Sequence, residues 1–484
     1  MRIGLEVNPE PAVDHRRTTD PASGRKVDLN HAVLRRIHPL VLILVAGLLP
    51  RLLLLEYFQD RPIRIVDAIN YDQLATSLVE TGSYVDKQGR LTSLRPPLYP
   101  GVVAALYRIF GTGNVHVVRV FQILISLITT AVVYRIGLEL YSRKVGVAAA
   151  LIHCFYPTLL GFNNLILSEV IFTFFLSIAF LLATLVIKWE SVTASILLGI
   201  TLGLGALTRS SLWLFSPLLA AFLFLACGPG IARRFRFSVI PLACFVLTVG
   251  PWIYRNTNVQ ETLTFIDAMG GRNVMMGNYE YTPLERSWAT ITTVTGDQAW
   301  HRVLAEAVPN YDDLTQGQKD KCAMRYGIGF FLDHPVLSVQ RSLVKFFNFW
   351  QLDRTLVAGS MAGHFGELSK ATVLVLATPV CAGYIFVMFG AVFGALTRPP
   401  SDVRLRWMQV ITVAFPCLIH SIAFAHSRYH LPLIPILAVY TAAAVIHWRD
   451  VRPHRMLVGG VSVCVVLVVG WMREFIVVDL SHFS

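Results

Sequence analysis

The stretch PLVLILVAGLLPRLLLLEY, residues 39–57, is followed closely by the polar stretch IVDAINYDQLA at residues 65–75. A helix needs about 20 residues, each rising 1.5 Å, to cross the roughly 30 Å of hydrocarbon in a bilayer. The first stretch is long and apolar enough to do so, and Arg35 and Arg36 before it favour a start in the cytoplasm. The polar stretch is therefore expected to emerge at the opposite membrane face.

The composition of the 484-residue chain agrees with a membrane protein. Hydrophobic residues make up 54% and charged residues 15%, and the mean hydropathy of +0.56 is too high for a set of ordinary soluble domains. The net charge of +12 is typical of basic cytoplasmic loops, and we do not expect nucleic-acid binding. The seven cysteines show neither a disulfide framework nor the spacing of a zinc site.

Further apolar stretches alternate with short polar connections along the chain. Every connection expected in the cytoplasm carries Lys or Arg, as the positive-inside rule requires. We therefore predict an all-α polytopic membrane protein with about 11 transmembrane helices. Their starts lie near residues 39, 120, 145, 170, 192, 212, 237, 371, 407, 431 and 456. The apolar piece from Leu98 to Phe110 is too short to span and is expected to lie in the interface.

This topology divides the chain into five parts. Residues 1–38 are expected to form a disordered cytoplasmic tail, and residues 39–254 an N-terminal transmembrane catalytic module with a first outer loop at 58–116. Residues 255–370 form a larger mixed non-cytoplasmic segment, residues 371–473 the C-terminal transmembrane helices, and residues 474–484 a tail. The protein is predicted to be multi-pass, in the plasma or inner membrane if it is bacterial, with its active site on the non-cytoplasmic side.

The stretch from Pro335 to Trp350 is the most distinctive part of the outer segment. It combines several aromatic residues with Arg341 and Lys345. This mixture suits an interfacial helix whose basic side chains point toward lipid phosphate. A helix packed on the protein itself explains the same pattern.

Two acidic residues at the expected outer ends of helices are candidate catalytic groups. Asp67 and Tyr71 are four positions apart and share one face if a helix begins here. This position suits a role of Asp67 as a general base, but it also suits a role as the N-cap of the helix. Glu169, in LILSEVIF, has apolar neighbours on both sides, where a carboxylate is costly. It is kept there either for chemistry or as the partner of an arginine.

Basic and aromatic residues gather on the same expected face. Arginine binds phosphate through paired hydrogen bonds, and histidine changes charge near neutral pH. A side chain that reaches toward lipid headgroups is the competing interpretation for each. The motifs are ALTRSSL with Arg209, PWIYRN with Arg255 and Asn256, and HSRYHLP with His426, Arg428, Tyr429 and His430. Two histidines without a third ligand do not indicate a metal site.

In this order, the motifs resemble the GT-C superfamily of integral-membrane glycosyltransferases, particularly the protein O-mannosyltransferase and lipid A aminoarabinose transferase branch. The similarity extends over about residues 51–444. It is carried by D-x-x-x-Y at 67–71, LRPPLYP at 94–100, SE at 168–169, LTR at 207–209, PWIYRN at 251–256, GGRNVMMGN at 270–278 and RYHLPLIP at 428–435.

The resemblance implies an inverting glycosyltransferase that uses a polyprenyl-phosphate-linked sugar donor in the membrane lipid and a protein, lipid or glycan acceptor. Asp67 matches the family's catalytic first-loop aspartate, and Glu169 matches a second acidic position that is often aspartate in members. Ala68 stands where some relatives carry a second carboxylate. A phosphate leaving group needs no general acid, so one base and several cations suffice.

Roles follow for the remaining candidates. Glu169 would orient the acceptor or support the base, and the candidate phosphate ligands are Arg209, Arg255 and Arg428. The full set of candidate substrate-binding residues is Tyr71, Arg95, Tyr99, Arg209, Arg255, Asn256, His426, Arg428 and Tyr429. No cofactor is predicted: a divalent metal is compatible with the reaction, but nothing in the sequence indicates one.

Two other classes of protein compete with this interpretation. A transporter or flippase for a lipid-linked sugar predicts charges near the bilayer midplane and often two related halves. Here the charges lie at the outer ends of helices, and no repeated half is evident. A noncatalytic subunit of a membrane complex would tolerate loss of both acidic residues.

Overall fold

The computed structural model describes residues 38–61, 63–285, 287, 299–450 and 454–479. Within these residues the secondary structure is helical, apart from an isolated bridge between Val85 and Leu91. The predicted all-α polytopic class is therefore confirmed. The expected disordered tail lies outside the described residues except for His38, and so do the last residues of the C-terminal tail.

The helix bundle contains eight described helices that are long and apolar enough to cross a membrane. Three predicted spans form shorter helices of 12, 17 and 12 residues, which are α6, α9 and α10. One reason is local: Tyr156 precedes Pro157, a position that disfavours helix, so α6 stops just before it. The bundle consists of α2 (Pro39–Phe58), α5 (Val115–Leu140), α6 (Arg143–Cys154), α8 (Glu169–Trp189), α9 (Val192–Thr208), α10 (Phe215–Ala226), α11 (Ile231–Val259), α17 (Lys370–Thr397), α18 (Val403–Ile422), η4 (Ser427–Leu433) with α19 (Ile434–Ile446), and α20 (His454–Glu474).

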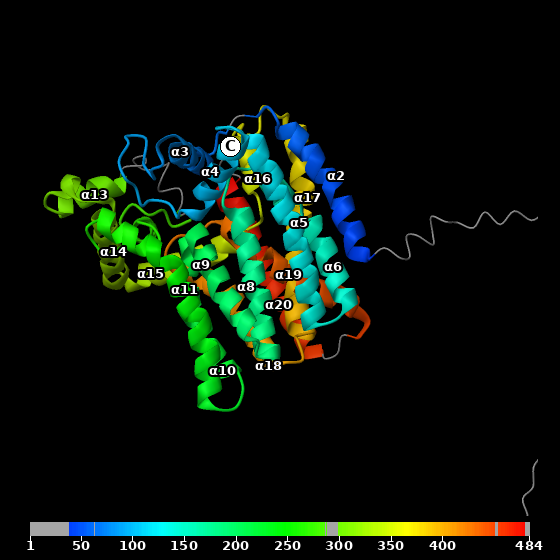
Figure 1. Cartoon of the computed structure of the whole chain (residues 1–484). Helices are drawn as coiled ribbons and strands as arrows, with labels where there is room; N and C mark the ends of the chain where they lie inside the picture. The colour runs from blue at the N-terminus through cyan, green and yellow to red at the C-terminus, as the bar shows by residue number, and fades with distance from the viewer. Residues whose placement is uncertain (1–37, 62, 286, 288–298, 451–453, 480–484) are drawn as a thin grey trace, which may run out of the picture.

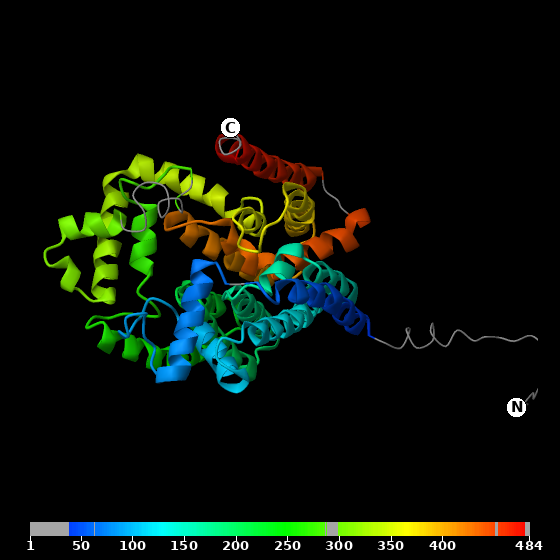
Figure 2. The same ribbon diagram turned by 90° about the horizontal axis from the view of Figure 1, so that it is seen from above.

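The core of the bundle lies around α8 and α19. In the span that contains η4 and α19, 78% of the residues are buried, and α19 packs against α17, α6 and α5. Small residues allow the closest helix contacts. A Cβ on Gly199 of α9 would lie 2.2 Å from the carbonyl oxygen of Pro241 in α11, so α9 and α11 touch through their backbones. α20 packs mainly on α17 and lies at the edge of the bundle (Figure 2).

The outer segment forms a second group of helices beside the bundle (Figures 1 and 2). A small core of its own includes Met275, Tyr279, Trp300 and Tyr311. Its elements are α12 (Gly270–Gly277), α13 (Ala299–Ala307), η3 (Tyr311–Asp313), α14 (Gln316–Asp333) and α15 (Pro335–Phe349), followed by α16 (Thr355–Met361).

The structure distinguishes between the two interpretations of residues 335–350: α15 packs on the protein itself, and its basic side chains do not point toward lipid phosphate. Its basic residues point into the protein, where Arg341 donates to the Tyr279 carbonyl at 2.9 Å and Lys345 donates to the Ile422 carbonyl at 2.7 Å. The Tyr279 carbonyl also accepts from the Thr282 N–H, and the Ile422 carbonyl from the Asn278 side chain, so each cation adds a second donor to a carbonyl that already has one. The helix therefore packs on the protein through its basic face. Its opposite, exposed face is apolar and carries Val336, Val339, Leu343 and Phe346.

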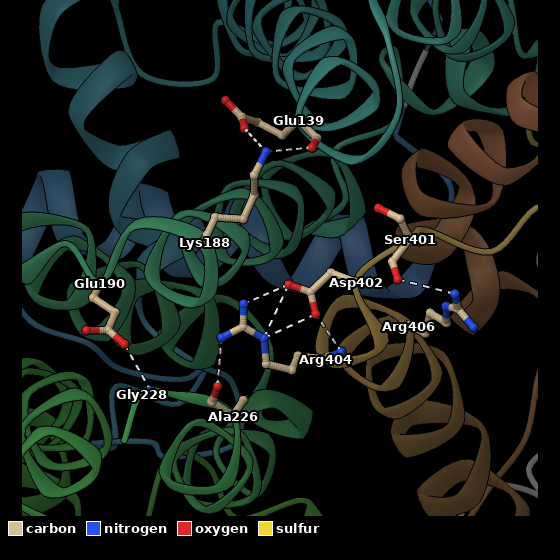
Figure 3. A network of polar contacts seen from close by, with 9 residues as sticks. All are labelled: Glu139, Lys188, Glu190, Ala226, Gly228, Ser401, Asp402, Arg404 and Arg406. Atoms are coloured by element: carbon tan, nitrogen blue, oxygen red, sulfur yellow. Dashed lines mark hydrogen bonds and ion pairs between the residues drawn. The ribbon is translucent and has the colours of Figure 1, made fainter. Parts of the chain in front are cut away.

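The two ends of the bundle differ in their connections. One end carries α3 (Val66–Thr81), α4 (Leu98–Phe110) and α7 (Pro157–Phe162), and Figure 1 shows it at the top. α4 is the short helix predicted from sequence. At the other end, ion pairs join helix termini: Lys188 contacts Glu139 at 2.6 Å, linking α8 to α5 (Figure 3). Arg404 at the start of α18 donates to the Ala226 carbonyl at the end of α10.

Candidate active site

A cavity of about 680 Å³ lies at the α3 end of the bundle. Its walls come from the first loop and α3, the start of α8, the end of α9, α12, and the junction of α18 with η4. The charged side chains that line it are Arg64, Arg95, Arg209, Arg272 and Arg428 and the carboxylates of Asp67, Glu169 and Asp267. Five arginines against three carboxylates leave this cavity with an excess of two positive charges.

Five of these side chains form a continuous row of alternating charge. Asp67 contacts Arg95 through one carboxylate oxygen and Arg428 through the other, both at 2.6 Å. Glu169 contacts Arg209 at 2.8 Å and lies 3.8 Å from the Nε atom of Arg428. Arg428 thus links the two acidic residues that the sequence analysis selected. The structure brings both predicted catalytic residues into one site.

Local structure explains how each group reaches the cavity. Pro96 and Pro97 restrict the backbone just before α4, with Pro97 as the N-cap residue of that helix, and Arg95 directly precedes them. Arg209 ends α9 in an extended conformation, with φ −144° and ψ 121°, so its side chain leaves the helix axis. Glu169 lies in the first turn of α8, where the helix dipole favours a negative charge.

The alternative roles of the two carboxylates can now be assessed. Ile65 is the N-cap of α3, so Asp67 lies in the first turn and the N-cap interpretation is wrong. The proposed pairing of Glu169 with an arginine is present, with Arg209 as the partner. This pairing does not exclude chemistry, because the side chains of Arg209 and Arg428 are 20% and 22% exposed and both line the cavity.

The ion pairs change the acidity of Asp67. Burial alone would raise the pKa of this carboxyl, but the charges of Arg428 and Arg95, and their hydrogen bonds, outweigh burial and hold the pKa well below its usual value. Asp67 is therefore ionised at any physiological pH. While both guanidiniums remain bound to it, it is a weak base.

Two tyrosines hold the arginines in place. The guanidinium of Arg95 lies 5.6 Å from the ring centre of Tyr71. Those of Arg209 and Arg428 lie 5.4 and 5.7 Å from the ring centre of Tyr429. Cation–π contacts of this kind restrict the orientation of a guanidinium without using its N–H donors. Most of those donors can therefore still bind a ligand.

Four predicted substrate-binding residues do not line the cavity, and they have structural roles instead. Tyr99 lies behind Tyr71 and donates to Gln122 at 2.9 Å, and the His426 side chain accepts from the backbone of Arg428 at 3.1 Å. Their positions near active residues in the sequence made them candidates, but their polar atoms already hold neighbouring elements.

Arg255 and Asn256, which were also predicted to bind substrate, hold neighbouring loops in the same way. Arg255 donates to the Thr92 carbonyl at 2.6 Å, and Asn256 donates to the carbonyls of Phe265 and Ile266. They connect the end of α11 to the loops on either side of the cavity. Sequence position alone could not distinguish this structural role from phosphate binding, because a cation at a helix end is suited to either.

Three charged residues of the cavity were missed: Arg64, Asp267 and Arg272. Asp267, in TFIDAMG, is a lone carboxylate among apolar residues just after a span, which is the same signal that identified Glu169. It accepts hydrogen bonds from the Ser210 hydroxyl and the Met269 backbone N–H. Burial nevertheless raises the pKa of Asp267 to about 6. Arg272 belongs to the GGRNVMMGN motif but was given no role.

The described residues contain no group of three or more His, Cys, Asp or Glu side chains placed to hold a metal. His430, one of the two histidines considered as ligands, is buried with its Nδ1 atom 2.8 Å from the Phe349 carbonyl. This histidine therefore has a structural role.

Comparisons with known proteins agree with the motifs. Residues 94–254 match the family model of dolichyl-phosphate-mannose-protein mannosyltransferases. ArnT from Cupriavidus metallidurans, solved with undecaprenyl phosphate bound, is similar at 15% identity and a TM-score of 0.50, over 90% of this chain and 65% of its own. An oligosaccharyltransferase from Archaeoglobus fulgidus, solved with zinc and sulfate, gives 15% identity and a TM-score of 0.52 over 90% and 52%.

The chain thus spans less than two thirds of either solved relative. No curated protein matches the sequence significantly. The structural matches establish a shared fold, and with the family match they confirm the resemblance that the motifs carried.

Proposed function

We propose that this chain, a multi-pass membrane protein with the fold of the GT-C glycosyltransferases, is an inverting glycosyltransferase that uses a polyprenyl-phosphate sugar. The observation that carries the proposal is the row of charges in the cavity, where Arg428 joins Asp67 to Glu169. Such a row offers cations for a phosphate and a carboxylate for a proton within one site.

The charge of the cavity suits the donor. A polyprenyl-phosphate sugar is a phosphodiester with one negative charge, and loss of the sugar leaves a phosphate monoester that carries nearly two. The cavity has an excess of two positive charges. It is therefore matched more closely to the departing phosphate than to the intact donor, and this difference lowers the barrier to transfer.

Donor binding would also activate the base. The phosphate competes with Asp67 for the N–H groups of Arg95 and Arg428, so the pKa of Asp67 rises toward its ordinary value. The freed carboxylate then takes the proton of an acceptor hydroxyl while the hydroxyl oxygen attacks the anomeric carbon. The carbon–oxygen bond to phosphate breaks, its electron pair stays on the phosphate, and the anomeric configuration inverts. Glu169 keeps Arg209 oriented toward the phosphate throughout.

Apolar side chains beside the cavity support a lipid-linked donor. Phe172, Leu176, Phe215 and Phe415, from α8, α10 and α18, line a small pocket of about 30 Å³ that shares Arg209, Ser211, His420 and Tyr429 with the charged cavity. A prenyl chain that displaced these side chains would place its phosphate at Arg209. The bound undecaprenyl phosphate of the ArnT structure is a lipid of this class. The acceptor would be a protein, lipid or glycan.

The same proposal places the cavity on the non-cytoplasmic side of the membrane. The connections that the sequence analysis assigned to the cytoplasm, which contain Arg143, Lys188 and Arg404, lie at the end opposite α3. Basic residues are retained on the cytoplasmic side, so the cavity faces outward.

Loss of the Asp67 carboxylate tests this function. The purified full chain would be incubated in nanodiscs with radiolabelled polyprenyl-phosphate mannose and membrane extract, and release of polyprenyl phosphate measured. We expect Asp67→Asn to abolish release while the thermal stability stays close to that of the wild type. The matched control is Asp72→Asn on the same helix, whose side chain accepts from Tyr107 outside the cavity.

The alternative classes predict different results. A flippase would move the labelled lipid across the bilayer without cleaving it. Undiminished release by Asp67→Asn would remove this residue as the base. A wild-type protein that releases no polyprenyl phosphate from donors of several sugars would refute the glycosyltransferase assignment.

A further inference from the structure

A cavity of about 700 Å³, here called the lateral cavity, lies in the C-terminal part of the helix bundle. Its walls come from α15, α17, α18, α19 and α20. Except for α15, each of these helices belongs to a span that is long and apolar enough to cross a membrane. The lateral cavity therefore lies largely at the depth of the hydrocarbon layer of the bilayer.

The wall of the lateral cavity is almost entirely apolar. Within the part of the chain that the structure describes, no charged side chain lines it. Its polar side chains are engaged within the protein: the Tyr440 hydroxyl donates to Gln409, and the Ser462 hydroxyl donates to the Val458 carbonyl at 2.9 Å. A buried water needs about three hydrogen-bond partners, so this wall does not hold water.

A void of this size is also too costly to stay empty. Protein interiors contain few gaps larger than a water molecule, because the atoms around a gap lose their packing partners. The cost of a cavity rises with its volume, and for several hundred Å³ it exceeds the net stability of a typical domain. Since neither vacuum nor water suits the lateral cavity, hydrocarbon from the surrounding membrane is the filling that it favours.

The lateral cavity is open to the bilayer along one side. Val410 and Leu418 of α18 and Val463 and Val466 of α20 line it, yet these four side chains are 44–59% exposed. α20 packs mainly on α17, so the opening follows the seam between α18 and α20. A hydrocarbon chain can enter through this seam directly from the membrane.

Trp350 at the end of α15 closes the lateral cavity toward the outer segment. Its backbone carbonyl accepts from the indole nitrogen of Trp471 at 2.8 Å and from the hydroxyl of Tyr384 at 3.0 Å, which ties α15 to α20 and α17. Phe346 and Phe347 line the cavity beside it. A chain must therefore enter sideways, and its headgroup stays outside at the membrane surface.

α18 separates the lateral cavity from the proposed donor site. Pro416 and Ile419 face the small pocket beside the charged cavity, whereas Val413 and Cys417 face the lateral cavity. No residue of the described ranges lines both the lateral cavity and the charged cavity. A chain in the lateral cavity therefore does not lead to the phosphate ligand Arg209, and the cavity suits a lipid other than the donor.

We propose that the lateral cavity binds an acyl chain of a bilayer phospholipid. The chain enters between α18 and α20 and packs against the apolar wall in place of core side chains. It thereby holds α20 and α18 together, and α18 is the helix that leads to Arg428. The lipid site goes beyond the proposed glycosyl transfer and does not depend on it, since its wall shares no described residue with the charged cavity.

Photolabelling tests the lipid site directly. The full chain would be placed in nanodiscs of phosphatidylethanolamine and phosphatidylglycerol, with a phosphatidylglycerol that carries a diazirine in the middle of one acyl chain. Exchange into detergent before irradiation removes lipid from the open surface of the protein. We expect the label to remain on Ala414 and Val463, which line the lateral cavity, and to be lost from Leu247, which is exposed on α11.

A substitution that fills the lateral cavity provides the matched comparison. In Ala414→Phe the added ring occupies part of the cavity, so the label on Val463 should be lost. Ala243→Phe makes the same change at an exposed position of α11 and should keep the label. Val466→Trp fills the cavity from α20 and gives the same test if Ala414→Phe does not fold.

Thermal unfolding in detergent provides the second measurement. Added phosphatidylglycerol should raise the melting temperature of the delipidated wild type and of Ala243→Phe, because a ligand that binds the folded state stabilises it. In Ala414→Phe the ring replaces the missing contacts, so lipid should give no further increase.

Three results would overturn the lipid site. Label that remains equally on Val463 and Leu247 after detergent exchange would show unspecific contact only. Undiminished label on the cavity residues in both filling variants would show that the chain binds elsewhere. A polyprenyl phosphate with the same diazirine is the competing probe, and label from it in the absence of label from the phospholipid would assign the lateral cavity to the lipid of the donor instead.

Discussion

Arg428 and Asp67 are 361 positions apart in the chain, yet their side chains form an ion pair of 2.6 Å. Arg428 belongs to η4 in the C-terminal part of the bundle, and Asp67 to the first helix after the first span. The charged cavity is thus complete only when the C-terminal helices pack against the N-terminal module. A catalytic module that contains this cavity would have to include η4 in addition to the predicted residues 39–254.

Arg428→Lys tests whether one planar cation must serve both acidic residues. A guanidinium reaches Asp67 through Nη2 and Glu169 through Nε, whereas an ammonium group offers a single point of contact. We expect kcat to fall about a hundredfold with a smaller change in donor KM. Arg108→Lys, on the exposed end of α4, should leave both values unchanged. Wild-type kcat in Arg428→Lys would show that the bridge is not used.

The pH profile tests the part played by Asp267. Its pKa of about 6 reflects burial and the nearby charge of Asp320, opposed by Ser210, the Met269 N–H and Arg95. The carboxyl is protonated below this pH and ionised above it, so the stronger, charge-assisted hydrogen bond from a substrate hydroxyl forms only in the upper range. We expect kcat/KM for the acceptor to fall as the pH drops through about 6.

Substitution separates Asp267 from the other carboxylates. Asp67 cannot account for this fall, because its pKa in the free enzyme lies far lower. In Asp267→Asn the acceptor kcat/KM should be reduced at pH 8 and should no longer change near pH 6. A limb near pH 6 that persists in Asp267→Asn would assign the titration to another group.

Sequence analysis identified best the residues whose charge would be energetically costly at their position unless it were paired or used. A carboxylate at the end of an apolar helix, such as Glu169, is costly unless it is paired or used, so its position alone is informative. Asp267 carries the same signal but lies in a connection with no regular pattern. Its distance from Glu169 in space depends on how the connection before α12 lies against the start of α8, and no local pattern specifies that packing.

Helix-terminal cations were harder to interpret. Arg428 and Arg255 both follow apolar spans, yet one faces the cavity and the other binds the carbonyl of Thr92. The mixture of aromatic and basic residues in α15 predicted a helix, but Arg341 and Lys345 turn inward to carbonyls that only the folded chain presents. Local composition thus predicts the element, whereas the direction of a long cationic side chain depends on buried acceptors far away in the sequence.

Lys345→Met tests whether this inward cation stabilises the site. Lys345 is buried and donates to the Gly277 carbonyl at 3.0 Å and to the Ile422 carbonyl at 2.7 Å, which end α12 and α18. Methionine retains the apolar stem but removes the ammonium donor. The Ile422 carbonyl keeps its hydrogen bond from the Asn278 side chain, whereas the Gly277 carbonyl loses this donor, at a cost of about 1–3 kcal/mol if it stays dry. We expect a lower melting temperature in detergent. Lys87→Met, at an exposed loop, should have no effect, and an unchanged melting temperature in Lys345→Met would show that water replaces the ammonium group.

The close contact of α9 with α11 leads to a paired test. A Cβ on Gly199 would lie 2.2 Å from the Pro241 carbonyl oxygen and 2.6 Å from the Cβ of Cys244, so Gly199→Ala must push the two helices apart. Gly250 lies on α11 with no atom within 4 Å of the position of an added Cβ. Gly250→Ala should therefore be neutral or slightly stabilising, because alanine favours helix. Since α9 carries Arg209 into the cavity, we expect Gly199→Ala to lower both the melting temperature and kcat. Equal melting temperatures and equal kcat values in the two variants would show that the helices are not packed backbone to backbone. The position of Arg209 would then not depend on this contact.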